Sequence, residues 1–209
     1  MSEIHTQPEV ADIQKSENFA YQEIKPESGI TPQESKQFWN EKFESLSNSD
    51  VHYDDNGTIY RRGDNLEPNA VIEKNGYTFK TDDNGRVISA EGALHIPEKT
   101  PRAMDSMEAV GKGDQIEGQD ERFHLIGHQF GGSDGIENLV PGDGKLNHGE
   151  YLSMETKLAD AVKDGCNVKL KVEPVYLDNS YRPVEFRATY TIDGEKTVQV
   201  FRNGRENEA

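Results

Sequence analysis

The chain has little cysteine: Cys166 is the only one among 209 residues. A single cysteine cannot form an internal disulfide, so the sequence excludes a small fold held by disulfides and fits a reducing compartment. Cys166 precedes a predicted strand, where a small, semi-buried side chain is the simplest interpretation.

Long apolar runs are also missing. No stretch approaches the roughly 18 apolar residues expected of a membrane-spanning helix. The first residues lack the basic and apolar regions of a secretory signal peptide. We therefore expect no membrane association and a cytoplasmic location in the producing cell, with any export depending on a specialised secretion system.

Basic residues are few: 23 lysines and arginines stand against 39 aspartates and glutamates, giving a formal net charge of −16. The first fifty residues carry 10 acids and 4 bases, so −6 of that charge lies there and −10 lies in the remainder. Proteins that bind long runs of phosphate through Lys and Arg are basic. We therefore expect this chain to contact few phosphates, to use a metal ion, or to bind a basic partner.

Apolar residues make up only 33% of the chain, so part of it is expected not to bury enough surface to fold. Residues 1–30 are polar and acidic without a helical or strand period, which predicts a disordered acidic tail. We assign residues 31–55 to an adaptor helix and linker. Residues 56–205 are assigned to the main domain.

The adaptor helix has a clear predicted start. Thr31-Pro32-Gln33-Glu34 combines a capping Thr, a Pro at the first helical position and a Glu three residues after the cap. The predicted helix continues to about Leu46 and places Phe38, Trp39 and Phe43 along one side. This stripe is expected to pack on the main domain or on a neighbouring molecule.

The main domain alternates between strand and helix patterns. Asn84-Gly85 lies between two alternating runs and predicts a hairpin, whereas residues 97–119 read as a long loop with a helical turn near Met104–Ala109. A helix opens near Leu146 and ends at Gly165. The predicted strands are Thr58–Arg61, Tyr77–Lys80, Arg86–Ala90, Val168–Val172, Val175-Tyr176, Phe186–Ile192 and Lys196–Phe201. We therefore predict an α+β fold with an antiparallel sheet.

One stretch concentrates acid/base and hard-metal groups. His124 ends a short apolar strand, a Gly131-Gly132-Ser133-Asp134-Gly135 loop follows, and the next helix carries Asn147 and Glu155. An imidazole suits a general base at neutral pH, and an amide oxygen is a hard ligand of the kind Mg²⁺ takes. Glu155 follows Asn147 by just over two helical turns and shares roughly its side. Such a set suits hydrolysis of a phosphodiester.

Arg122 lies two residues before His124 on the predicted strand and shares its face. Its guanidinium is placed to bind a phosphate through two hydrogen bonds. An ordinary surface or ion-paired arginine is the other interpretation.

His128 and His148 raise the alternative of a zinc site. On a continuing strand, however, the spacing from His124 to His128 separates two side chains on one face by about 13 Å. Both could not then bind one ion at about 2 Å. We therefore do not predict zinc from this spacing.

The sequence also resembles a known family across residues 69–200. The matching segments are Leu125-Ile126, Phe130-Gly131-Gly132, Ile136-Glu137-Asn138-Leu139-Val140-Pro141, Leu146-Asn147-His148-Gly149-Glu150-Tyr151 and Met154-Glu155. They resemble the DNA/RNA non-specific endonucleases of the ββα-metal (His-Me finger) superfamily, especially the branch found as toxin domains of bacterial polymorphic secretion systems. The resemblance implies a ββα-metal catalytic motif within the predicted fold.

The resemblance also implies roles for four residues. His124 matches the general base and Asn147 the direct Mg²⁺ ligand, with Mn²⁺ as the alternative ion. Glu155 matches the glutamate that supports the hydration of the metal. Asn138 matches an asparagine that helps to hold the site together.

For the whole protein, the resemblance implies sequence-non-specific cleavage of DNA or RNA that leaves 5′ phosphates. As a toxin effector domain, the protein would have an immunity protein and a secretion apparatus as partners. The chain departs from the family in one place, because Phe123 stands before His124 where the family usually has Gly. This departure and the net charge of −16 keep open an alternative: a catalytically impaired nuclease-fold protein that acts as a binding or regulatory partner.

Overall fold

Alternating apolar residues build the largest sheet of this protein. The computed structural model describes residues 50–98 and 102–204. Six antiparallel strands lie in the order β11-β10-β9-β6-β5-β4. They are β4 (Val71–Lys74), β5 (Tyr77–Thr81), β6 (Val87–Ala93), β9 (Val168–Val175), β10 (Glu185–Ile192) and β11 (Glu195–Arg202). The prediction of an α+β fold with an antiparallel sheet is confirmed.

Two smaller sheets accompany it. β1 (Val51–Tyr53), β2 (Ile59–Arg62) and β3 (Asn65–Leu66) form one antiparallel sheet, and β7 (Asp120–His124) pairs with β8 (Leu139–Asp143) in the other. β1 falls within the segment assigned from sequence to the linker. The predicted tail (1–30) and adaptor helix (31–46) lie outside the described residues. No helix among residues 50–98 and 102–204 is long and apolar enough to cross a membrane.

Three observed strands were not predicted from the sequence because they are short. β1, β3 and β4 have two to four residues each, too few for alternation to stand out. The predicted run Val168–Val172 and the first residue of the run Val175-Tyr176 belong to a single strand, β9, which ends at Val175. The helical turn expected near Met104–Ala109 is α3 (Met107–Gly111), which Ser106 caps.

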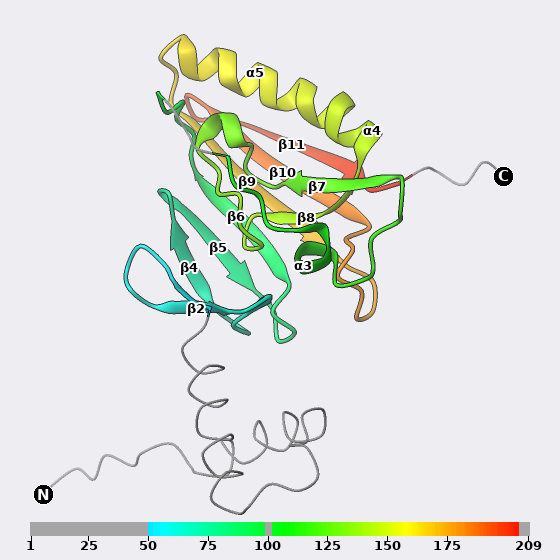
Figure 1. Ribbon diagram of the computed structural model, residues 1–209. Coiled ribbons are helices and arrows are strands. Elements are labelled where there is room, and N and C mark those ends of the chain that lie inside the picture. Colours follow the sequence, from blue (N-terminus) through cyan, green and yellow to red (C-terminus); the bar gives the residue numbers. More distant parts are fainter. Residues whose placement is uncertain (1–49, 99–101, 205–209) are drawn as a thin grey trace, which may run out of the picture. The chain divides into compact units, whose positions relative to one another are not determined.

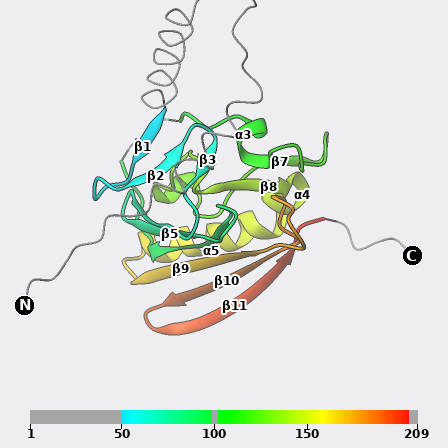
Figure 2. The same cartoon turned by 90° about the horizontal axis from the view of Figure 1, so that it is seen from below.

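A ββα unit contains the residues predicted to act. β7 and β8 pair with His124 opposite Leu139, and β8 leads directly into α4 (Gly144–Leu146), the π-helical turn η2 (Asn147–Tyr151) and α5 (Leu152–Lys163). α5 lies over the β9–β11 part of the large sheet (Figures 1 and 2). The expected ββα motif is therefore present.

Aromatic packing fixes this unit on the sheet. The ring of Phe123 stacks on Phe186 of β10, with centroids 4.4 Å apart and an interplanar angle of 4°. Tyr151 meets the edge of Phe123 at 4.5 Å, and all three side chains are buried. Because β7 and η2 both contact β10, the ββα unit and the large sheet share one core.

The helix that carries Asn147 and Glu155 is not the uniform α-helix that the sequence predicted. Gly149 has φ −110° and ψ −106°, and η2 is a π-helical turn between two α-helical pieces. Such turns inside helices frequently occur at functional sites. Here the irregularity falls between the two residues of interest, so their relative orientation could not follow from a period of 3.6.

Candidate active site

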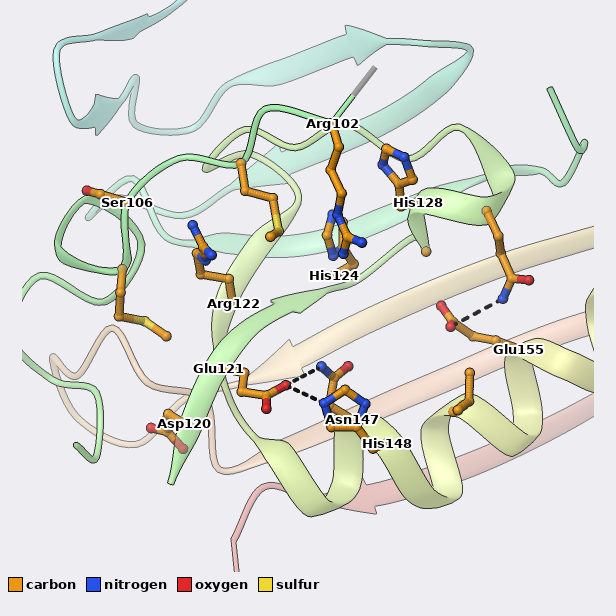
Figure 3. Close-up of a pocket in the computed structure, with 15 residues that line it drawn as sticks. Arg102, Ser106, Asp120, Glu121, Arg122, His124, His128, Asn147, His148 and Glu155 are labelled. Carbon is orange, nitrogen blue, oxygen red and sulfur yellow. Dashed lines mark hydrogen bonds and ion pairs between the residues drawn. The ribbon is translucent and has the colours of Figure 1, made fainter. Parts of the chain in front are cut away.

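A cleft of about 890 Å³ opens beside β7 and the following helix (Figure 3). Its walls come from β7, from the segment before α3, and from η1 (His128–Phe130), η2 and α5. Every ionisable group of the predicted site lines it. The charged and histidine side chains in its walls are Arg102, Asp120, Glu121, Arg122, His124, His128, His148 and Glu155.

Alternation along β7 separates the side chains of Arg122 and His124 from that of Phe123. Arg122 and His124 both line the cleft, as the strand period predicts, and Arg122 Nη1 donates to the Asp105 carbonyl oxygen at 3.2 Å. Phe123 points the other way, is fully buried and does not line the cleft. A Cβ at Gly142 would come within 2.5 Å of Phe123, so this glycine leaves room for the ring. The residue that departs from the family pattern therefore does not obstruct the approach to His124.

His124 is held by a carboxylate that sequence reasoning missed. Its Nε2 lies 2.9 Å from Asp134 Oδ1, and His128 Nδ1 lies 3.2 Å from the same oxygen. An ionised carboxylate only accepts hydrogen bonds, so both of these ring nitrogens carry protons. The lone pair of His124 is then on Nδ1, which bonds to no described residue. This tautomer leaves Nδ1 able to accept a proton.

The expected separation of His124 and His128 is wrong. Their ring centroids are 6.2 Å apart, because β7 ends at His124 and the chain turns into η1 at His128. The 13 Å estimate assumed that the strand continued. With the chain turned, both imidazoles converge on Asp134.

Asn138 accounts for the end of β7. Its Oδ1 accepts from the Ile126 amide at 2.8 Å, and its Nδ2 donates to the carbonyl oxygens of Ile126 and Ser133. Just after His124, these bonds take the place of the hydrogen bonds between β7 and β8. They also close the loop that joins the two strands. Gly132 must be glycine here, since a Cβ would lie 1.9 Å from the Ile126 carbonyl oxygen. Asn138 is fully buried and positions backbone; it does not line the cleft.

Asn147 has its amide orientation fixed by Glu121. The Asn147 Nδ2 donates to Glu121 Oε2 at 3.0 Å, and His148 Nε2 lies 2.8 Å from the same oxygen (Figure 3). Asn147 Oδ1 accepts no hydrogen bond from residues 50–98 or 102–204. The amide oxygen is thus left available to a ligand.

Glu155 lies farther along the cleft, close to Gly127. Gln129 Nε2 donates to Glu155 Oε2 at 3.4 Å, and a Cβ at Gly127 would lie 2.2 Å from Glu155 Oε1 (Figure 3). Burial raises the pKa of Glu155 to about 7, against the opposing hydrogen bond from Gln129. Its carboxyl therefore changes charge near neutral pH.

The electrostatics of the His124–Asp134 pair favour a neutral imidazole. Burial lowers the pKa of His124 from its ordinary value, although the hydrogen bond and charge of Asp134 oppose that change. Burial alone would raise the pKa of Asp134, but the hydrogen bonds from His124 and the Ala103 amide hold it below its ordinary value. At neutral pH the pair is a neutral base beside an ionised carboxylate.

The oxygen donors in the cleft fit a hard divalent cation. Mg²⁺ takes oxygen ligands and keeps several of its waters, so it needs only one or two direct protein ligands. The amide oxygen of Asn147 is available, and the carboxylates of Glu121 and Glu155 line the same cleft. These residues are of the types that hold Mg²⁺ or Mn²⁺.

Comparison with known protein families identifies the family of this chain. Residues 65–194 match the model of the DNA/RNA non-specific endonucleases. The chain belongs to this family. The family consists of metal-dependent phosphodiester hydrolases, and the ββα unit described above lies inside the matched region.

The chain is also similar to a secretion-system protein and to two solved nuclease structures. The type VII secretion system protein EssD of Staphylococcus aureus strain USA300 is 30% identical over 130 residues, covering 59% of this chain and 21% of EssD. The chain therefore spans about a fifth of the length of that relative. A solved "extracellular endonuclease" matches with TM-score 0.46 and 22% identity over 63% of this chain and 80% of that one. The "Structure of Sda1 nuclease with bound zinc ion" matches with TM-score 0.44 and 20% identity over 60% and 75%.

Four of the five residues predicted for the endonuclease site line one cleft: Arg122, His124, Asn147 and Glu155. The fifth, Asn138, lies in the loop behind His124. Their individual roles stay predictions. Sequence reasoning missed Asp134, Glu121 and Gln129 as partners of site residues. The sequence contained one signal for Asp134. This residue lies in the loop that joins β7 to β8, and the loop must bring the chain back close to His124.

Proposed function

We propose that this protein is a Mg²⁺-dependent, sequence-non-specific endonuclease that hydrolyses phosphodiester bonds of DNA or RNA. The observation that carries the proposal is the pairing of His124 with Asp134 in the same cleft as the available amide oxygen of Asn147. A base with a fixed tautomer and a hard oxygen ligand are the two parts that this hydrolysis needs from the protein.

His124 is the general base in this proposal. Its Nδ1 takes a proton from the attacking water, and the imidazolium that forms is stabilised by the Asp134 carboxylate at 2.9 Å. The oxygen of that water attacks phosphorus in line with the 3′ oxygen, which leaves, so the products carry 5′ phosphates. Because burial keeps His124 neutral, the base is in its reactive form at neutral pH.

Other residues hold the substrate and the cation. Asn147 Oδ1 would bind Mg²⁺ directly, and Glu155 would orient its hydration. When bound, the ion supplies electrostatic stabilisation of the charge that develops on the phosphate and on the leaving oxygen. Arg102 and Arg122 are the arginines that line the cleft, and both are placed to bind phosphate oxygens.

The charge of the chain supports a short footprint on nucleic acid. Within the cleft the two arginines provide positive charge, while the whole chain carries −16. Contacts limited to a few phosphates carry little sequence information, since sequence is read at base edges. This supports cleavage without sequence preference.

We further infer that the domain acts as a bacterial toxin effector. The similarity to EssD, a type VII secretion system protein, supports export by a specialised secretion system. An immunity protein in the producing cell would then be required to protect its nucleic acid. The acidic surface of the chain would suit a partner with a basic binding face.

Incubation of supercoiled plasmid with the protein tests the activity. Nicked and linear DNA should appear with Mg²⁺ and should be absent with EDTA, and a single-stranded RNA in the same assay gives the preference between substrates. If DNA and RNA stay intact with either Mg²⁺ or Mn²⁺ while the protein still binds DNA, the alternative of a catalytically impaired binding protein is correct.

The close approach of Gly127 to Glu155 gives a second test. Gly127 has φ −58° and ψ 145°, which alanine tolerates, but the added Cβ displaces the Glu155 carboxylate. We expect Gly127→Ala to change the free energy of unfolding by about 1 kcal/mol or less, because a flexible side chain can move. Plasmid nicking should slow by about 10²-fold.

The double variant Gly127→Ala, Glu155→Asp provides the control. A shorter carboxylate relieves the clash, so it should nick faster than Gly127→Ala alone. If Gly127→Ala nicks plasmid at the wild-type rate, Glu155 is not part of the proposed site.

A further inference from the structure

Three ligand atoms converge at one edge of the cleft. One ligand atom from each of His124, His128 and Asp134 lies within 4.8 Å of the ligand atoms of the other two. Asp134 Oδ1 is 2.9 Å from the first nitrogen and 3.2 Å from the second. This cluster differs from the Asn147–Glu121–His148 group, which lies on the helix side of the same cleft (Figure 3).

These separations are close to those around a bound zinc ion. With ligand bonds of about 2.0–2.1 Å, the atoms of a tetrahedral site lie roughly 3.3 Å apart. An ion between the two imidazoles and the carboxylate therefore requires these separations to change by a few tenths of an ångström to about 1.5 Å. Two histidines with one carboxylate and an open fourth position are a common catalytic zinc set. Imidazole ligands favour zinc-like ions over Mg²⁺.

One of the three ligands, Asp134, is also held by contacts outside the cluster. Asp134 Oδ2 accepts from the Ala103 amide at 2.7 Å, and the Asp134 carbonyl oxygen accepts from the Asp105 amide at 3.0 Å. All three side chains are largely buried, with exposures of 11% for His124, 24% for His128 and 9% for Asp134. Such outer contacts orient metal ligands before the ion arrives.

We propose that His124, His128 and Asp134 form a second cation site, selective for zinc-type transition-metal ions, whose occupation switches off cleavage. The binding half of this proposal stands on the geometry alone. The inhibitory half rests on the proposed function, because it requires His124 to be the general base.

Inhibition follows from the tautomer of His124. Without the ion, Nε2 carries the proton and donates it to Asp134, which leaves the lone pair on Nδ1. When Nε2 donates its own lone pair to the ion, the proton of the neutral ring must be on Nδ1. That nitrogen can then no longer accept a proton from water. The ring keeps its charge and its place, and only the position of the proton changes.

Calorimetric titration of the full chain with ZnCl₂ tests the binding half. We expect one site in the wild type, weakened about a hundredfold or more in His128→Gln, because loss of even an outer-shell partner costs about 10- to 100-fold in affinity. His148→Gln is the matched control, since it removes a histidine from the other group in the same cleft. Its zinc affinity should equal that of the wild type.

Nitrogen-detected NMR of the six histidine rings tests the tautomer directly. Zinc should move the His124 proton from Nε2 to Nδ1 in the wild type and should leave the rings of His128→Gln unchanged. This readout also shows whether His128→Gln retains the wild-type fold. The proposal is overturned if the wild type does not bind zinc, if His128→Gln binds it with wild-type affinity, or if only His148→Gln loses it.

Nicking assays at saturating Mg²⁺ test inhibition. Zinc should suppress cleavage, and the concentration for half-suppression should rise about a hundredfold in His128→Gln, relative to that variant's own zinc-free rate. If zinc binds as expected but no preparation cleaves nucleic acid, the cation site stands and the proposed nuclease function fails. If zinc binds and cleavage persists unchanged, the inhibitory half is wrong.

Discussion

His124→Ala is expected to lower the rate of plasmid cleavage by about 10²- to 10⁴-fold, the usual contribution of a general base. Mg²⁺ binding should persist, because the ligand that we propose for the ion is Asn147, on the helix side of the cleft. The measurement is nicking kinetics beside calorimetric titration with Mg²⁺. Added imidazole should restore part of the rate, since a small base can enter the space that the ring vacates.

Asn147→Ala is the matched variant and should behave in the opposite way. It removes the amide oxygen that would bind the cation, so Mg²⁺ affinity falls and raised Mg²⁺ recovers part of the rate. Imidazole should have no effect on it. Loss of Mg²⁺ binding in His124→Ala, or an unchanged rate for Asn147→Ala at limiting Mg²⁺, would show that the two roles are wrongly assigned.

Asp134→Asn is expected to cost nearly as much as loss of the base. The amide can present its NH₂ group to His124 Nε2, which then accepts and leaves the proton on Nδ1, the wrong tautomer. The same exchange behind the histidine of a serine protease lowers kcat by about 10⁴-fold, so we expect a loss of about 10²- to 10⁴-fold in kcat. Asp83→Asn, which removes one acidic charge from an exposed turn, is the control and should leave kcat unchanged.

The pH dependence of activity distinguishes a positioning role of Asp134 from a purely structural role. As pH falls, activity should decline first when Glu155, with a pKa of about 7, becomes protonated, and further when His124 becomes protonated, because the pKa of His124 lies below its ordinary value of 6.5. The hydrogen bond and charge of Asp134 raise that pKa. Their loss should therefore move the His124 step of the acid limb to lower pH in Asp134→Asn and leave the Glu155 step in place. A variant that only loosens the loop would lower the rate without moving the limb, and that result would contradict the role given to Asp134.

Local patterns in the sequence were sufficient to predict secondary-structure elements and the face of each element on which a side chain lies. The alternation in Arg122-Phe123-His124 already implies that Arg122 and His124 share one face and Phe123 takes the other, and the structure buries Phe123. The same reasoning could have removed the concern about Phe123 in advance. Side-chain direction in a strand depends only on the backbone of that strand, so it can be read locally.

Partners that come from other segments could not be read in this way. Asp134 reaches His124 and His128 because β7 ends at His124 and Asn138 closes the loop through three hydrogen bonds to backbone. Glu121 orients Asn147 across 26 residues because the ββα unit brings β7 and η2 to the same cleft. Neither contact follows from a period along the chain.

The sequence by itself therefore determined the α+β class, the longer antiparallel strands and the candidate base and metal ligand, because these depend on local periodicity and on the chemistry of single side chains. Only the tertiary structure decided which groups hold His124 and Asn147, and that His128 shares a carboxylate with His124. Those contacts depend on where a strand ends, how a loop closes and how aromatic packing seats the ββα unit on the sheet. A shift of one residue in the end of the strand, in the loop or in the packing would move the same side chains to other positions. The local sequence patterns would stay the same.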